Sequence, residues 1–303
     1  MKGKLTMNKT LKIAFLGGDR RQHTAAVKLA GGRYEIYGFM IDGECGAGII
    51  AADTLEDALR GASAVILPLP TSTDGVELNC RRADAPSLNL CELATAIDDR
   101  AVVIGGRLPS AFCDRLRERG IKYFDYFESE AFQIKNAYTT AEAALFIAME
   151  KLVRTVRGSD FAITGYGRIA KQLAALLVSL GGRVTVCARK ESDLVWAELA
   201  GCHTLHISAE DKSTLAPLLC GYDVIFNTVP HLLFDSDALR GLEKKTLLIE
   251  LASSPGGIDV FAAKQFGSRV LWAASLPGKY APESAGELIA DCVRGILEGE
   301  VSE

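Results

Sequence analysis

The sequence is poor in the residues that build metal sites and disulfide frameworks. Its 303 residues include only four histidines and eight cysteines, and no two cysteines are spaced as Cys-x-x-Cys. Without that spacing we interpret the cysteines as reduced thiols, most of them buried, rather than as zinc ligands or a redox pair. His203 and His206 have a spacing that a metal site can use, but both fall on a predicted strand, where packing or exposure is the simpler interpretation. We therefore predict no bound metal.

Long apolar runs and a strong excess of one charge are also missing. No run approaches the ~18 apolar residues that a membrane span requires, and the apolar segment 11–16 is too short for the core of a signal peptide. The formal net charge of -4 provides no basic surface for nucleic acid or an anionic membrane. We expect a cytoplasmic protein with no membrane and no nucleic-acid partner, which binds small molecules or other proteins.

Proline is scarce but glycine is plentiful, with nine prolines against 29 glycines, and 49% of the residues are hydrophobic. A chain of this length and composition can bury two separate cores. Short apolar segments alternate with helical patterns, which predicts an α/β fold of two doubly wound parallel-sheet domains. The predicted strands are residues 12–16, 35–40, 64–70, 101–104 and 122–126 in the first domain, and 161–164, 184–187, 223–226, 247–251 and 270–274 in the second. A further predicted strand of the second domain contains His203 and His206.

The most informative stretch lies between two predicted strands of the second domain. Gly165 permits a tight turn out of the first strand, Gly167 lets the backbone approach a pyrophosphate, and the small Ala170 lets helix and strand pack closely. The amide groups and the positive dipole end of the following helix then face the phosphates. This pattern predicts a Rossmann dinucleotide-binding domain, the alternative being a glycine turn of purely structural use.

The choice of cofactor is expected at the end of the strand 184–187. An enzyme for NAD usually carries Asp or Glu there, but this chain has Ala188, Arg189 and Lys190. Two cations suit a 2′-phosphate, so NADP is predicted and NAD stays possible; the alternative is a solvated pair of charges. The full predicted cofactor set is Gly165, Tyr166, Gly167, Arg168, Ile169, Ala188, Arg189, Lys190, Asn227, Thr228, Val229, Pro230, Leu276 and Pro277.

Polar side chains follow three predicted strands of the first domain. Ligands collect at the carboxyl ends of parallel strands, so these side chains are expected to form one rim. The guanidinium fork of arginine is suited to bidentate contact with a carboxylate. We predict an anionic, carboxylate-bearing substrate there, although each arginine also has an ordinary interpretation as a surface charge. The predicted substrate-binding residues are Asp19, Arg20, Arg21, Thr71, Ser72 and Arg107.

Two long helices are expected outside the two sheets, one that links the domains and one at the C-terminus. Thr139 and Glu142 form a capping box that would start a linking helix, and Ser284 and Glu287 form a second one for a terminal helix. The predicted segments are an N-terminal substrate or catalytic domain (1–138), the linking helix (139–157), the Rossmann domain (158–282) and a C-terminal helix (283–303) that packs back on the first domain. A cleft between the two domains is expected to hold the reaction.

Several motifs together resemble the family of dipicolinate synthase A-subunits of spore-forming bacteria. They are Gly17–Arg21, Asn136–Glu142, Gly165–Arg168, Asn227–Pro230, Leu251–Gly257 and Leu276–Pro282. The resemblance spans Lys12 to Leu297, and the sequence departs from the family pattern at Ala143 and Glu250, where Gly and Asp are expected.

The resemblance implies an activity and a partner. It implies NADP-dependent oxidation of dihydrodipicolinate or hydroxytetrahydrodipicolinate to pyridine-2,6-dicarboxylate in the mother cell of a sporulating bacterium. It also implies an oligomeric complex with the flavoprotein-like B-subunit of the same synthase. A small dicarboxylate would fit the arginine-bearing rim. A base must remove a proton, and the candidates are His231, Glu250 and Lys279, each with an ordinary structural interpretation as well.

Two other functions fit the same pattern. One is a reductase similar to shikimate dehydrogenase or 2-hydroxyacid dehydrogenases, which also combine two α/β domains. The other is a non-catalytic NADP-binding scaffold or regulator, because the sequence contains no unmistakable catalytic residue.

Overall fold

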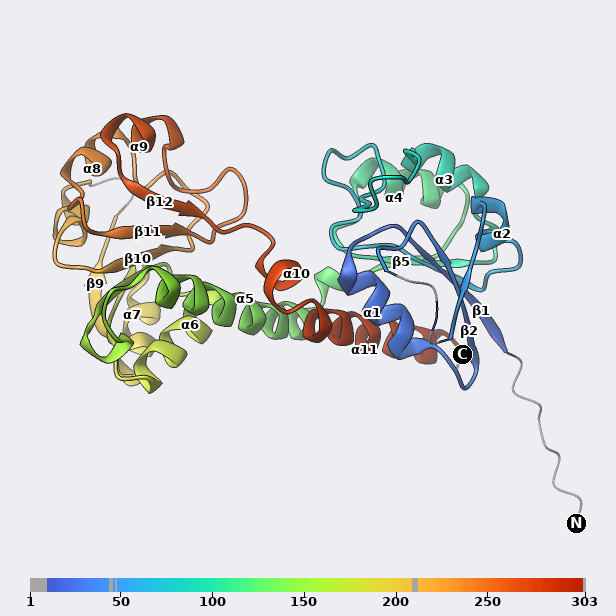
Figure 1. Cartoon of the computed structure of the whole chain (residues 1–303), viewed down its shortest axis with the longest axis horizontal. Coiled ribbons are helices and arrows are strands. Elements are labelled where there is room, and N and C mark those ends of the chain that lie inside the picture. Colours follow the sequence, from blue (N-terminus) through green and yellow to red (C-terminus); the bar gives the residue numbers. More distant parts are fainter. Residues whose placement is uncertain (1–9, 44–45, 47, 209–211, 302–303) are drawn as a thin grey trace, which may run out of the picture. The chain divides into compact units, whose positions relative to one another are not determined.

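The computed structural model describes residues 10–43, 46, 48–208 and 212–301. The chain divides into two compact units, the first comprising Met1–Gln133 and Ala281–Glu303 and the second comprising Ile134–Tyr280. Each unit contains one six-stranded parallel sheet flanked by helices (Figure 1). The predicted fold class, with two doubly wound parallel sheets, is confirmed.

The sheet of the first unit has the strand order β3-β2-β1-β4-β5-β6, and all neighbouring strands are parallel. Its strands are β1 (Leu11–Leu16), β2 (Tyr34–Phe39), β3 (Ile49–Ala51), β4 (Ala64–Ile66), β5 (Val102–Gly105) and β6 (Tyr123–Asp125). Ile13, Phe15 and Val65 in the central strands are fully buried, as expected for a parallel sheet covered on both faces. The strand order reverses between β1 and β4, so the carboxyl ends of β1, β4 and β5 share one edge.

The helices of the first unit include one from the far end of the chain. They are α1 (Arg20–Leu29), α2 (Leu55–Leu59), α3 (Leu90–Ala96), α4 (Ser110–Glu118), the 3-10 helix η1 (Tyr126–Glu128) and α11 (Pro282–Val301). Helix α11 packs against α1, with Ile289 and Val293 buried in the same core as Ile13. At Gly286 the two helices are so close that an added Cβ would lie 2.5 Å from Cβ of Thr24.

The sheet of the second unit has the strand order β12-β11-β10-β7-β8-β9, again entirely parallel. Its strands are β7 (Asp160–Thr164), β8 (Arg183–Ala188), β9 (His203–His206), β10 (Val224–Asn227), β11 (Leu247–Glu250) and β12 (Arg269–Trp272). The order reverses between β7 and β10, which is the place where open α/β sheets bind their ligands.

The helices of the second unit include several that were not predicted. They are α5 (Glu130–Lys151), η2 (Val156–Gly158), α6 (Arg168–Ser179), α7 (Glu191–Leu199), η3 (Lys212–Leu219), α8 (Ser236–Gly241), α9 (Val260–Phe266) and α10 (Leu276–Tyr280). Ala170, Leu173 and Leu177 of α6 are fully buried, which places the apolar stripe of this helix on the sheet.

Both predicted capping boxes are wrong. Helix α5 starts at Glu130, so Thr139 lies inside it. Residues 130–138 contain neither Gly nor Pro, so nothing in them interrupts the helix before Thr139. Helix α11 starts at Pro282, so Ser284 is also internal, and the amide of Ala285 donates to the carbonyl of Ala281. Proline favours the first helical position because its ring fixes a helical φ and its missing N–H would have no partner there.

The cysteines are less buried than predicted. Cys187 and Cys202 are buried, but Cys91 and Cys220 are exposed, and Cys45 lies outside the described residues. Within the described ranges, no cluster of three or more His, Cys, Asp or Glu side chains could hold a metal ion. No helix in that part of the chain has the length and hydropathy to cross a bilayer.

Candidate functional site

The glycine loop between β7 and α6 packs tightly against the end of β10. Gly165 has a φ of +81°, and a Cβ at this position would lie 2.9 Å from Oγ1 of Thr228 and 3.0 Å from Cγ2 of Val229. The Thr228 hydroxyl donates to the carbonyl of Thr164 at 2.7 Å, which joins the ends of β7 and β10. Only glycine combines this backbone conformation with so little space.

Gly167 has the opposite surroundings. It is exposed, and a Cβ added to it would meet no protein atom within 4 Å. As the N-cap of α6 it has no side chain to occupy the first amide groups of the helix. The space next to Gly167, at the positive end of the α6 dipole, is therefore open, which fits a pyrophosphate. Ala170, one turn into α6, is fully buried against the sheet, as the motif requires.

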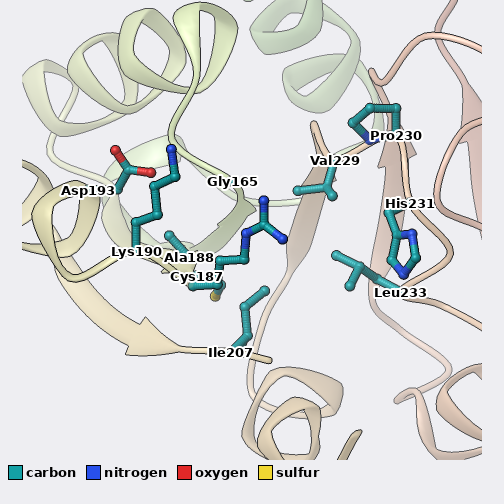
Figure 2. A pocket seen from close by; sticks show the side chains of 11 residues that line it. Gly165, Cys187, Ala188, Lys190, Asp193, Ile207, Val229, Pro230, His231 and Leu233 are labelled. Atoms are coloured by element: carbon teal, nitrogen blue, oxygen red, sulfur yellow. The ribbon is translucent and has the colours of Figure 1, made fainter. Parts of the chain in front are cut away.

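A pocket of about 660 Å³ opens beside this loop (Figure 2). It is bounded by the carboxyl ends of β7, β8, β9 and β10 and therefore spans the point where the strand order reverses. The lining residues are Gly165, Cys187, Ala188, Arg189, Lys190, Asp193, Ile207, Val229, Pro230, His231 and Leu233. The volume is in the range of small-molecule and cofactor pockets.

Charged side chains of both signs lie on the β8 side of the pocket. Arg189 and Lys190 are exposed where the sequence predicted cations for a 2′-phosphate. Asp193 also lines the pocket, and Figure 2 shows it beside Lys190. His206 at the end of β9 contacts the carbonyl of Arg189 with its Nε2 at 3.1 Å. The contact with β9 thus fixes the backbone at Arg189. The carboxylate of Asp193 lines the same part of the pocket as the two cations.

Four lining residues were missed in the sequence: Cys187, Asp193, Ile207 and Leu233. Ile207 and Leu233 are buried and give the pocket an apolar wall. Burial raises the pKa of the Cys187 thiol to about 12, so this cysteine is an apolar lining group at neutral pH. Of these four residues, only Asp193 could have been found from the sequence. It is an acid in the first turn of α7, which begins directly after Arg189 and Lys190.

Part of the predicted cofactor set does not line the pocket. Tyr166 is 8% exposed and Leu276 only 2%, and both belong to the apolar core of the second unit. Pro277 is buried next to Leu276 in α10. The remaining predicted residues outside the lining are Gly167, Arg168, Ile169, Asn227 and Thr228.

The three candidate bases have different surroundings. His231 is exposed and lines the pocket, whereas Lys279 is exposed on α10 and is not among the lining residues. Glu250 is 1% exposed. Its carboxylate is enclosed by protein and therefore cannot contact a substrate proton in the pocket.

Glu250 is held by a set of N–H donors. The Asn227 side-chain amide donates to Oε1 at 2.8 Å and to Oε2 at 3.0 Å. The backbone amide of Ala252 donates to Oε1 at 2.9 Å, and that of Gly257 donates to Oε2 at 2.8 Å. Burial raises the pKa of Glu250, and the hydrogen bonds from Gly257, Ala252 and Asn227 oppose the increase.

Asn227 connects this carboxylate to the pocket wall. Its Nδ2 also donates to the carbonyl of Val229 at 3.0 Å, and its Oδ1 accepts from the amide of Val229 at 3.3 Å. The same Oδ1 accepts from the Thr164 hydroxyl at 2.5 Å. A buried polar network thus crosses the ends of β7, β10 and β11.

In the first unit, two of the predicted substrate residues bind each other. Asp19 caps α1 by accepting from the amide of Arg21 at 3.0 Å, and it accepts from Arg21 Nη2 at 2.8 Å and Nε at 2.9 Å. Arg21 Nη2 also donates to the carbonyl of Leu69. Arg21 is only 7% exposed. Through these hydrogen bonds its guanidinium joins the segments that follow β1 and β4.

The predicted hydroxyl residues also have internal partners. Thr71 is fully buried and its hydroxyl lies 3.1 Å from the carbonyl of Pro68 and 3.2 Å from that of Gly106. Ser72 donates to Asp74 at 2.9 Å. Backbone amides that follow Asp74, together with Ser72, lower the pKa of this carboxyl to about 2, so it holds the turn as an anion.

Two arginines of the rim remain accessible. Arg20 and Arg107 are both exposed at the carboxyl ends of β1 and β5. The Arg107 guanidinium lies 4.4 Å from the centre of the Phe127 ring, which supports it from one side.

Comparison with known proteins agrees with the geometry. The profile of the family described as the N-terminal domain of the dipicolinate synthase A-subunit matches residues 12–127. The dipicolinate synthase A-subunit of Bacillus subtilis (strain 168) is 28% identical over 291 residues, covering 95% of this chain and 96% of that protein. The crystal structure of the corresponding protein from Bacillus halodurans matches with a TM-score of 0.84 and 26% identity, covering 96% of this chain and 99% of that chain.

A more distant match shows how widely the fold is used. A transhydrogenase from Sinorhizobium meliloti matches with a TM-score of 0.65 and 15% identity, covering 99% of this chain and 93% of that chain. At this identity the likeness concerns the fold alone. The resemblance predicted from the sequence motifs is confirmed by the matches to dipicolinate synthase A-subunits.

Proposed function

We propose that this chain, which is similar to dipicolinate synthase A-subunits over nearly its whole length, oxidises dihydrodipicolinate, or its hydroxytetrahydro precursor after loss of water, to pyridine-2,6-dicarboxylate with NADP+. The observation that supports this proposal best is the pocket beside an open glycine loop, in a chain of which 95% aligns with the dipicolinate synthase A-subunit of Bacillus subtilis. Dihydrodipicolinate loses a hydride and a proton, and the gain of aromaticity favours the product.

The glycine loop and the residues after β8 are the proposed cofactor site. The Gly167 backbone and the first amides of α6 would hold the pyrophosphate, and Arg189 and Lys190 would face the 2′-phosphate. When bound, NADP+ supplies the hydride acceptor. Ile207 and Leu233 would exclude water from one wall of the pocket.

Arg20 and Arg107 are the proposed contacts for the substrate carboxylates. Both are exposed, while Arg21 and Thr71 are buried and hydrogen-bonded within the protein. We assign Asp19, Arg21, Thr71 and Ser72 the role of shaping the ends of β1 and β4 beneath this rim. A guanidinium can bind each carboxylate of a small dianion in a bidentate manner.

His231 is the proposed base. Among the three candidates it alone is both exposed and part of the pocket lining, and histidine is the side chain that most often serves as a general base. It would take the ring proton as the hydride leaves. His231→Gln should therefore lower kcat at least about 100-fold, in the range typical for general bases, and leave the Kd for NADP+ unchanged.

The related proteins are named as one component of a synthase with more than one kind of chain, which is the ground for proposing a partner. We propose a complex with the flavoprotein-like B-subunit in the cytoplasm of a sporulating cell, as the family resemblance implies. Co-purification of the two proteins, and turnover with and without the second one, would test the complex.

The activity can be followed by the ultraviolet absorbance of the aromatic product. The assay combines the lysine-branch synthase that supplies the substrate, NADP+, this chain and the flavoprotein-like partner. Product should require this chain, and Gly167→Val should abolish it by filling the space at the pyrophosphate. If product forms equally well when this chain is omitted, the catalytic proposal fails and the chain is an NADP-binding scaffold instead.

A further inference from the structure

Glu250 has a second connection to the pocket wall besides Asn227. The amide of Gly257 donates to Glu250, and the carbonyl of Gly257 accepts from the amides of Leu233 at 3.0 Å and Phe234 at 2.9 Å. Leu233 lines the pocket. Glu250 is therefore hydrogen-bonded to residues that hold both ends of the wall segment 229–233.

The space around this connection is filled. A Cβ at Gly257 would lie 2.5 Å from Nδ2 of Asn227, 2.6 Å from the carbonyl oxygen of His231 and 2.7 Å from that of Val229. The wall segment thus wraps around the point where Glu250 meets its donors. Gly257 is therefore closely packed between Asn227 and the wall segment, and we expect a change in its hydrogen bond to Glu250 to shift the wall.

The contacts require the ionised form of Glu250. Both carboxylate oxygens accept hydrogen bonds, and in the described part of the chain the partners are all N–H donors. A protonated carboxyl would point its own hydrogen at one of them and lose that contact. Asn227 and Trp272 flank Glu250 on the neighbouring strands, and the loop 251–257 contains no ionisable side chain. None of these neighbours therefore titrates together with it.

We propose that Glu250 is a positioning residue of the dinucleotide pocket, which fixes the wall segment 229–233 through Asn227 and Gly257, and that it is not the catalytic base. This inference rests on the proposed function in one respect only, namely that the pocket binds a nicotinamide dinucleotide. It assigns a role to a buried carboxylate that the chemistry of hydride transfer does not use.

The test measures the Kd for NADP+ by titration calorimetry with the full chain. Glu250→Gln replaces one acceptor by an amide NH2 that faces a backbone N–H, so we expect the Kd at pH 8 to rise at least about tenfold, equivalent to ~1.4 kcal/mol. Glu250→Asp keeps the charge but shortens the reach to Ala252 and Gly257, and should have an intermediate effect. Glu243→Gln is the matched control, because Glu243 also accepts a backbone amide, from Gly221, but lies outside the pocket lining.

The pH dependence separates positioning from a general loss of stability. The donors favour the anion, so protonation of Glu250 at low pH should weaken wild-type binding toward that of Glu250→Gln. The ratio of the two Kd values should be large at pH 8 and fall toward one as the pH decreases, while titration of the cofactor phosphate cancels in the ratio. A structural role without connection to the pocket would change the thermal midpoint but leave this ratio near one at every pH.

Each other outcome is decisive as well. If wild type binds no dinucleotide, the proposed function fails, whereas equal binding by wild type and Glu250→Gln contradicts only the positioning role. Normal binding with loss of turnover in Glu250→Gln would make Glu250 a catalytic group and overturn the inference. Loss of folding in both Glu250 variants would overturn it too, because the residue would then stabilise the unit rather than the pocket.

Discussion

At the scale of single residues, we expect a few charged side chains to decide which dinucleotide the proposed cofactor site prefers. Arg189 and Lys190 favour a 2′-phosphate, but Asp193 lines the same pocket and its charge opposes that preference. An acid near the ribose is the usual device for binding the 2′-hydroxyl of NAD. In the proposed cofactor site we therefore expect the balance between the cations and the acid, rather than the cations alone, to set the selectivity.

Replacing these side chains should change the two affinities separately. Arg189→Ala should raise the Kd for NADP+ roughly tenfold and leave that for NAD+ unchanged, because it removes a contact worth ~1.5 kcal/mol to a charged group. Asp193→Asn should lower the Kd for NADP+ by a factor of roughly three to ten. Both constants can be measured by titration with each cofactor, and Arg240→Ala, at an exposed arginine of α8 outside the pocket lining, serves as the control. The preference for NADP would be wrong if wild type bound both cofactors equally and Arg189→Ala changed neither affinity.

Sequence reasoning at this scale succeeds where the signal is local. The Gly165 loop and the cations after β8 are contiguous with their strands, so spacing alone places them at the pocket. Ile207 and Leu233 also line the pocket, but they come from segments that are distant in the sequence, so spacing does not predict them. Asn227 contacts Glu250 only because β10 and β11 are neighbouring strands. A candidate base in the sequence becomes a buried acceptor in the structure because burial depends on this long-range pairing.

At the scale of helices and strands, the sequence predicts most strands of both sheets well. Apolar runs bounded by glycine or polar residues mark them. Strand β3 was not predicted; it lies at the edge of its sheet, and only one of its three residues is buried. The two helix starts that were assigned to capping boxes, at Thr139 and Ser284, are wrong. A capping box starts a helix only if the residues before it leave the helical conformation, and before Thr139 they do not.

Helix α11 offers a test of packing between elements, because two of its glycines have opposite surroundings. At Gly286 an added Cβ would lie 2.6 Å from the carbonyl oxygen of Arg21, whereas at exposed Gly295 it would meet nothing within 4 Å. Gly286→Ala should therefore destabilise the protein by ~1–3 kcal/mol through overpacking against α1. Gly295→Ala should stabilise it by ~0.5–1 kcal/mol because alanine favours the helix.

Chemical denaturation of both variants would measure these differences. Equal changes of the same sign would mean that α1 and α11 are not packed as closely as the structure has them.

At the scale of the whole molecule, the two units carry different parts of the proposed chemistry. The first unit matches the N-terminal domain of the family and exposes Arg20 and Arg107, and the second has the glycine loop and the pocket. The two sheets share a strand order that reverses near the middle, and in each case the functional candidates lie at the carboxyl ends beside the reversal. The same topological rule thus underlies both proposed binding sites.

This division predicts that mutations in the two units affect different constants. The double variant Arg20→Ala with Arg107→Ala should raise the KM for the dicarboxylate at least about tenfold, since it removes two charged donors, and should leave the Kd for NADP+ unchanged. Arg189→Ala should do the reverse, with a normal KM for the dicarboxylate at saturating NADP+. Arg60→Ala, an exposed arginine that ends α2, controls for the loss of positive charge from the first unit. If the double variant and Arg60→Ala have the same KM as wild type, the rim does not bind the substrate, and the carboxylates must be held by other residues.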